Sequence, residues 1–144
     1  MKKIIFLSIL TVLFFTACKK PNVTPSCTTD AASIAGAYKI TAVTYKATAT
    51  SAEMDYFNTL FPDACDRDNV YTFQTNSTYQ IKDAGAVCSP NGDDNGTWSF
   101  VSAGSMIIDG DPINLESFNC KTLVLVNLDT HVASDRLKLT LTKQ

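Results

Sequence analysis

The sequence predicts an all-β domain, an antiparallel up-and-down barrel of about eight strands with one short inserted helix. Short runs in which apolar and polar residues alternate recur from residue 35 to residue 142, and a period of two is typical of half-buried antiparallel strands. Turn-forming residues separate consecutive runs by only a few positions. Because strands joined by short turns usually pair with their neighbours, a meander that closes on itself is the simplest topology.

The first strand is expected at 35–45, where the apolar residues change face between Ile40 and Val43. A change of phase inside a strand indicates a β-bulge or a strong bend. The central segment then predicts a hairpin around Asn76 and a third strand that opens with Gly96. The aromatic residues that fall on one face of these central strands are Tyr71, Phe73, Tyr79, Trp98 and Phe100.

A short amphipathic helix is expected over 50–61. Thr50 and Glu53 fit a capping box, apolar residues follow at helical spacing as far as Phe61, and Pro62 ends the helix. The apolar stripe of this helix would cover an open end or an outer face of the sheet.

Four more strands are expected at 105–109, 113–118, 123–128 and 136–142. The run 123–128 is apolar on both faces, so we expect it to be covered on both sides, with the helix as the candidate for the outer cover. The last strand alternates cleanly, with Leu137, Leu139 and Leu141 facing inward.

Residues 1–17 have the pattern of a secretory signal peptide. Lys2 and Lys3 precede a short apolar run that ends with small residues before Cys18. This pattern is similar to a bacterial lipoprotein signal, which implies that Cys18 is acylated and becomes the mature N-terminus. The alternative is an ordinary signal peptide with an incidental cysteine. Two or three acyl chains would anchor the chain stably to a membrane, where one chain would not.

The organisation that follows is a lipidated N-terminus and flexible tether at 18–33 and a single domain at 34–144. Removal of Lys2 and Lys3 with the signal leaves 10 basic against 14 acidic side chains, a net charge of −4. This balance gives no support for a nucleic-acid partner. Lys19 and Lys20 stand after Cys18 in place of the aspartate associated with inner-membrane retention in some bacteria and of the acidic run that resembles a surface-export signal. This favours the periplasmic face of the outer membrane over the cell surface.

The remaining cysteines form an even set of four in an exported chain, which favours disulfide bonds. They are Cys27, Cys65, Cys88 and Cys120. Four cysteines allow three connectivities, and the sequence does not choose among them. We favour Cys65–Cys88, which bracket one hairpin, and therefore Cys27–Cys120. A zinc site is the alternative, but the spacings that zinc sites use are missing from the sequence.

Several motifs of the domain are distinctive: the Gly36-Ala37-Tyr38 opening, the segment from Cys65 to Phe73, the later Cys88, and the strand from Gly96 to Phe100. Together they resemble the small lipocalin-like lipoproteins of Bacteroidetes-type bacteria. The likeness covers roughly residues 34 to 142 and implies a lipocalin-like barrel. Tyr38 stands where true lipocalins carry tryptophan, and the domain is shorter than theirs.

Six aromatic residues are candidates for lining a pocket for a flat or apolar molecule. They are Tyr38, Tyr71, Phe73, Tyr79, Trp98 and Phe100. The alternative is that they simply fill the core.

Other sites have weaker support. Asp66, Asp68, Asp93 and Asp94 lie in loops near the cysteines, but their spacing matches no EF-hand, so solvated turn acids are expected and no metal or cofactor is predicted. His131 is the single histidine and has Ser134 and Asp135 near it, but no nucleophile motif is present. We expect no enzyme activity.

The sequence therefore favours a lipid-anchored, non-enzymatic protein of the bacterial envelope that binds a small hydrophobic or amphipathic ligand inside the barrel. The alternative is a filled barrel that docks another envelope protein. A hydrophobic cavity open at one end would favour the first function, and a packed interior with an exposed apolar patch would favour the second.

Overall fold

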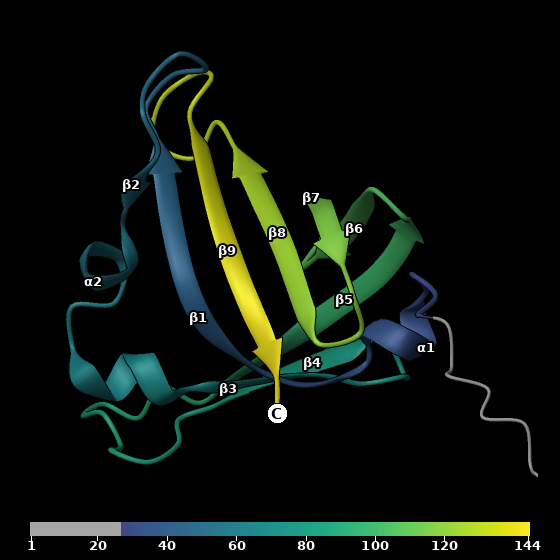
Figure 1. Cartoon of the computed structure of the whole chain (residues 1–144). Coiled ribbons are helices and arrows are strands. Elements are labelled where there is room, and N and C mark those ends of the chain that lie inside the picture. Colours follow the sequence, from purple (N-terminus) through teal and green to yellow (C-terminus); the bar gives the residue numbers. More distant parts are fainter. Residues whose placement is uncertain (1–26) are drawn as a thin grey trace, which may run out of the picture.

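The computed structural model describes residues 27–144, so Cys18, the signal at 1–17 and most of the tether lie outside the described residues. Within the described part, nine antiparallel strands have the order β2-β1-β3-β4-β5-β6-β7-β8-β9, and β1 also pairs with β9. That extra pairing closes eight strands into a barrel and leaves β2 outside it (Figure 1). The predicted all-β barrel is confirmed.

The strands are β1 (Gly36–Lys46), β2 (Met54–Asp55), β3 (Val70–Phe73), β4 (Thr78–Lys82), β5 (Asp94–Ser102), β6 (Ser105–Ile108), β7 (Asp111–Phe118), β8 (Thr122–Leu128) and β9 (Arg136–Lys143). The helices are α1 (Ala31–Ile34), α2 (Phe57–Leu60) and the 3₁₀ helix η1 (Ala64–Asp68). Long strands β1, β9 and β8 lie side by side along one wall of the barrel (Figure 1).

Strand β1 closes the barrel because it changes partners along its length. Its beginning pairs with β3, its end pairs with β2, and its other edge pairs with β9. The register against β9 shifts between Ile40 and Ala42. This bulge keeps both Ile40 and Val43 buried, as the change of phase in the sequence predicted.

The start of the described chain covers one end of the barrel. Helix α1 is capped by Asp30, whose Oδ1 accepts a hydrogen bond from the Ser33 amide at 2.7 Å. Ile34 is completely buried, and its carbonyl accepts a hydrogen bond of 2.6 Å from the Tyr38 hydroxyl. Lys143 donates to the Ser33 carbonyl at 2.9 Å. These contacts make this the closed end of the barrel.

The prediction of a helix over 50–61 is wrong in its first half. Met54 and Asp55 pair with the end of β1 instead, and Met54 is 56% exposed. Glu53 does not cap a helix, because its carboxylate is held by Thr44 and Lys138. The helix that does form, α2, starts only after Asp55, whose Oδ1 accepts from the Phe57 amide at 2.9 Å.

Helix α2 also does not cover the outer face of β8. It lies against β1, on the side away from β9 and β8 (Figure 1). The outer residue Val126 is nevertheless only 4% exposed. An ion pair between Glu116 of β7 and Arg136 of β9 joins the two neighbours of β8 and therefore passes across its outer face.

Both predicted disulfides are confirmed. Cys27–Cys120 has a Cα–Cα distance of 5.7 Å and ties the start of the described chain to the β7–β8 turn. Cys65–Cys88 has a Cα–Cα distance of 5.3 Å and ties η1 to the loop that follows β4. In the chain-entropy account the two bonds contribute roughly 4–5 and 3 kcal/mol respectively.

Candidate functional site

The barrel interior contains an apolar cavity of about 150 Å³. Its walls come from six strands on all sides of the barrel. The lining residues are Ile40, Tyr71, Phe73, Tyr79, Ile81, Ile108, Leu125, Leu139 and Leu141. A dry cavity of this size accommodates a molecule about as large as benzene.

A second, wider hollow of about 380 Å³ adjoins this cavity. The two share Ile108, Leu125 and Leu139 as walls, so the apolar interior continues into the hollow. Asp109, Asp111 and Asn127 contribute polar groups to its lining, together with further apolar side chains. Asp111 is solvent-exposed and starts β7, so this mouth lies at the end of the β6–β9 wall opposite the β7–β8 turn and Cys120.

Three of the six predicted pocket residues line the inner cavity, namely Tyr71, Phe73 and Tyr79. The other three, Tyr38, Trp98 and Phe100, line neither the cavity nor the hollow beside it. Tyr38 and Trp98 are core residues: their rings pack edge-on against Phe73, and the Trp98 Nε1 donates to the Gln74 carbonyl at 2.9 Å. The six predicted aromatic residues therefore divide into three that line the cavity and three that do not.

Sequence reasoning missed the aliphatic part of the wall. Ile40, Ile81, Ile108, Leu125, Leu139 and Leu141 line the cavity. The alternation that placed Leu139 and Leu141 on the inner face was the available signal, but it does not distinguish a side chain that borders a cavity from one that fills the core.

One hydrogen-bonded group stands where the cavity meets its mouth. The Tyr79 hydroxyl donates to Asp109 Oδ2 at 2.5 Å, and the Thr97 amide donates to Asp109 Oδ1 at 2.9 Å. Burial, together with this bond, raises the pKa of Tyr79 to about 12. The same bonds lower the pKa of Asp109. Asp109 is thus held ionised at neutral pH beside the apolar wall.

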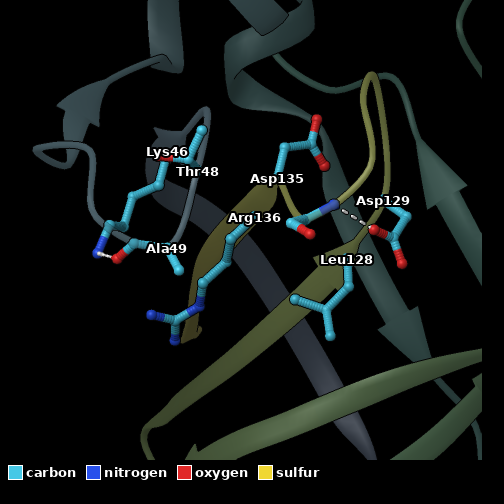
Figure 2. A pocket seen from close by; sticks show the side chains of 8 residues that line it. Lys46, Thr48, Ala49, Leu128, Asp129, Asp135 and Arg136 are labelled. Carbon is cyan, nitrogen blue, oxygen red and sulfur yellow. Dashed lines mark hydrogen bonds between the residues drawn. The ribbon is translucent and has the colours of Figure 1, made fainter.

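A larger surface hollow of about 440 Å³ lies between the β1–β2 and β8–β9 loops (Figure 2). Its polar groups are already used within the protein. Lys46 donates to the Ala49 carbonyl at 3.3 Å, Arg136 pairs with Glu116, and Asp129 accepts from the Ser134 amide at 2.6 Å. We therefore assign these groups to contacts that stabilise the loops and the neighbouring strands.

The neighbourhood of His131 is also structural. Its ring packs against Tyr45 and Tyr56. Asp135, which is completely buried, accepts hydrogen bonds from the amides of residues 130–132 and from the Tyr45 hydroxyl, at 2.7 to 3.1 Å. Asp135 Oδ2 thus accepts a hydrogen bond from the backbone amide of His131. We assign these contacts to the structure of the β8–β9 loop.

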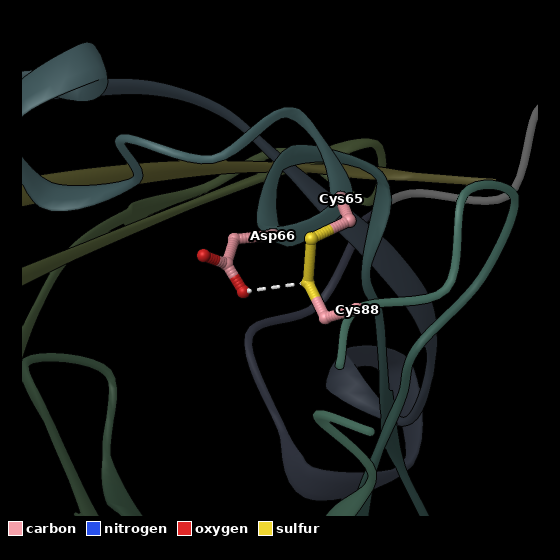
Figure 3. A group of neighbouring side chains, drawn as sticks. All are labelled: Cys65, Asp66 and Cys88. Atoms are coloured by element: carbon pink, nitrogen blue, oxygen red, sulfur yellow. Dashed lines mark hydrogen bonds between the residues drawn. A yellow bond between two sulfur atoms is a disulfide. The ribbon is translucent and has the colours of Figure 1, made fainter. Parts of the chain in front are cut away.

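Cys65, Asp66 and Cys88 form a third cluster (Figure 3). Asp66 Oδ1 lies 3.3 Å from the Cys88 sulfur. Both sulfurs are joined in a disulfide, and a disulfide sulfur has neither a proton to donate nor the negative charge that a metal ligand needs. We therefore assign this cluster to the disulfide.

Residues 34–125 match the family model of the lipocalin-like domain. No curated protein and no solved structure matches the chain. Among residues 27–144, no helix has the length and apolar character needed to span a membrane.

Proposed function

Because the chain belongs to the lipocalin-like domain family, we propose that it is a non-enzymatic protein that binds a small hydrophobic or amphipathic molecule inside the barrel. The observation that carries this proposal is the apolar cavity, which continues through shared walls into a hollow at one end of the barrel. Ligand sites of this kind combine mostly apolar walls with a few polar groups that fix orientation.

The polar groups at the mouth narrow the class of ligand. The inner cavity of about 150 Å³ takes only a small apolar group, while the hollow of about 380 Å³ has room for the rest of the molecule. Asp109 and Asp111 place negative charge at the mouth. A ligand with an apolar body and a cationic or hydrogen-bond-donating end fits this arrangement, whereas a carboxylate end would be repelled.

The proposed setting is the bacterial envelope, with Cys18 as the site of a lipid anchor and the periplasmic face of the outer membrane as the place. The sequence pattern before Cys18 supports the anchor. Two disulfides among the described residues agree with an exported protein.

The first test is native mass spectrometry of the full chain, purified in mild detergent from its own cell envelope, followed by organic extraction. A bound species of defined mass would support the proposal and identify the class of ligand. Protein that is empty and also fails to bind N-phenyl-1-naphthylamine would contradict it, and would favour the docking alternative.

Leu139→Trp tests the place of binding. Leu139 borders both hollows, so the larger ring should fill the space and weaken binding of N-phenyl-1-naphthylamine by about tenfold or more. Val101→Trp is the matched control, because Val101 is 56% exposed on β5. Equal loss of binding in both variants, at unchanged melting temperatures, would place the probe elsewhere and refute the assignment.

A further inference from the structure

Three buried side-chain oxygens without a hydrogen-bond partner belong to the two segments that the Cys65–Cys88 disulfide joins, η1 with the start of β3 and the end of β4 with its following loop. They are Asp68 Oδ1, Asn69 Oδ1 and Asp83 Oδ1, and no other buried side-chain nitrogen or oxygen within residues 27–144 lacks a partner. Asn69 is 7% exposed and Asp83 is 4% exposed. Leaving a buried polar oxygen unpartnered is costly, so three on two linked segments call for an explanation.

The strand register brings these side chains together. Val70 of β3 pairs with Lys82 of β4, so Asn69 and Asp83 are the next opposite positions along the same ladder. They stand on the face that also carries Tyr71 and Ile81, two residues of the cavity wall. Opposite side chains on such a pair have Cβ atoms about 5 Å apart.

The loop after β4 folds back over the same place. A methyl group added at Gly92 would lie 3.6 Å from Asp83 Oδ2 and 3.8 Å from Asn69 Nδ2, so both side chains border Gly92. Asp68 Oδ2 accepts a hydrogen bond from the Ala86 amide at 2.9 Å. Asp68, Asn69 and Asp83 therefore all face one loop, which the disulfide fixes to η1.

Each carboxylate uses one oxygen for structure and keeps the other free. Asp83 Oδ2 accepts from the amides of Cys88 and Gly92, both at 2.9 Å, while Asp83 Oδ1 has no partner. In Asp68 likewise, Oδ2 accepts the hydrogen bond from the Ala86 amide and Oδ1 has no partner. The two carboxylates, with one free oxygen each, and the free amide oxygen of Asn69 offer three hard oxygen donors around the same loop.

Protein cations do not neutralise this pair of acids. Within residues 27–144 the ion pairs are Lys82–Asp93, Arg136–Glu116 and Lys138–Glu53, so neither Asp68 nor Asp83 has an ionic partner. Neighbouring Arg67 instead donates to the carbonyls of Phe61 and Pro62 at 2.8 and 2.7 Å. A buried carboxylate without a cation is costly.

We propose that Asp68 Oδ1, Asn69 Oδ1 and Asp83 Oδ1 bind a calcium ion. Calcium takes oxygen ligands, tolerates irregular geometry, and accepts carbonyls and water to complete its shell. The two carboxylates supply a formal charge of −2 that matches a divalent ion. The ion would fasten the loop after β4 to the start of β3, next to the cavity wall.

The test is calcium binding by the full chain in detergent after removal of metals with EDTA, followed by isothermal titration with CaCl₂ and by melting curves with and without CaCl₂. We expect one saturable site and a higher melting temperature in calcium. Asp68→Asn should weaken binding about tenfold or more, since site charge tunes calcium affinity. Asp94→Asn, which removes the same charge from an exposed position on nearby β5, should leave binding unchanged.

Absence of calcium binding at millimolar concentration would overturn the proposal and would leave water as the partner of these oxygens. Equal weakening in the Asp68 and Asp94 variants would also overturn it, because binding would then follow surface charge. If Asp68→Asn does not fold, Asn69→Leu removes the amide oxygen without changing charge and should abolish binding of calcium. Calcium affinity unchanged in a folded Asn69→Leu protein would contradict the site.

Discussion

Gly96 is required as glycine by its neighbours. A Cβ at this position would lie 2.1 Å from Asp109 Oδ1 and 2.6 Å from the Tyr79 ring. We expect Gly96→Ala to separate the Tyr79–Asp109 pair and to lower the free energy of unfolding by about 1–3 kcal/mol in urea denaturation. Gly104→Ala is the control, because no atom lies within 4 Å of its added Cβ. Similar stability of the two variants would contradict the argument.

Asp135 makes the β8–β9 loop sensitive to acid. Burial alone would raise the pKa of Asp135, but the hydrogen bonds from the amides of His131, Val132 and Thr130 outweigh burial and lower it. A lowered pKa in the folded state stabilises the protein at pH values above the unfolded value, near 3.8, and this contribution is lost as the pH falls further.

Asp135→Asn should therefore lower the melting temperature at pH 7 by about 4 °C or more, and should reduce the difference between urea midpoints measured at pH 6 and pH 3. Other carboxylates with lowered pKa values, such as Asp109, leave part of that difference in place. Asp63→Asn, at an exposed position, is the control. A variant whose midpoint changes with pH as much as that of the natural protein would exclude this role for Asp135.

These residue-level features were not predictable from the sequence. Asp135 and His131 were singled out only as members of a catalytic group that the spacing did not support, and Asp109 only as the end of a strand. Asp109 owes its role to Tyr79, a partner distant in the chain, and Asp135 adds a bond from distant Tyr45 to those it accepts from the amides of residues 130–132. Local pattern carries no information about such pairs.

At the level of elements, alternation of apolar and polar residues predicted most barrel strands because they bury one face, and β8 was predicted from a run that is apolar on both faces. Pairing with sequence neighbours was enough to order the strands. The helix predicted over 50–61 did not form in full, and the reason is physical. Its capping box is worth about 1 kcal/mol, whereas Met54 and Asp55 gain ladder hydrogen bonds to β1 and Glu53 gains contacts with Thr44 and Lys138. Tertiary pairing therefore outweighed the local helix signal.

The residues that line the cavity were likewise only partly predictable from the sequence. Aromatic side chains stand out in the sequence, and three of them do line the cavity. Trp98 does not, because its ring packs on Phe73 and its Nε1 bonds to Gln74. Which inward residue ends up beside empty space depends on the curvature of the closed barrel, and the bulge at Ile40–Ala42 is part of that curvature.

At the scale of the whole molecule, the closed end and the mouth lie at opposite ends of the β6–β9 wall. The Cys27–Cys120 disulfide holds the start of the domain at the β7–β8 turn, while the mouth opens near Asp109 and Asp111 at the other end of β7. Eight residues lie between Cys18 and Cys27, so the two cysteines are at most about 30 Å apart. A lipid on Cys18, as proposed, would therefore keep the closed end within that distance of the membrane, and the mouth at the other end of the barrel would be free to face the aqueous phase.

Cys18→Ala tests this arrangement. Loss of the anchor should move the protein from the membrane to the soluble fraction, because no other acylated residue is proposed. Affinity for N-phenyl-1-naphthylamine should change less than about twofold, since the proposed anchor joins the chain at the closed end, opposite the mouth. Ser26→Ala, in the same tether, should remain membrane-bound. Continued membrane association of Cys18→Ala would refute the lipid anchor, whereas release with a large loss of probe affinity would show that the cavity is loaded from the membrane side.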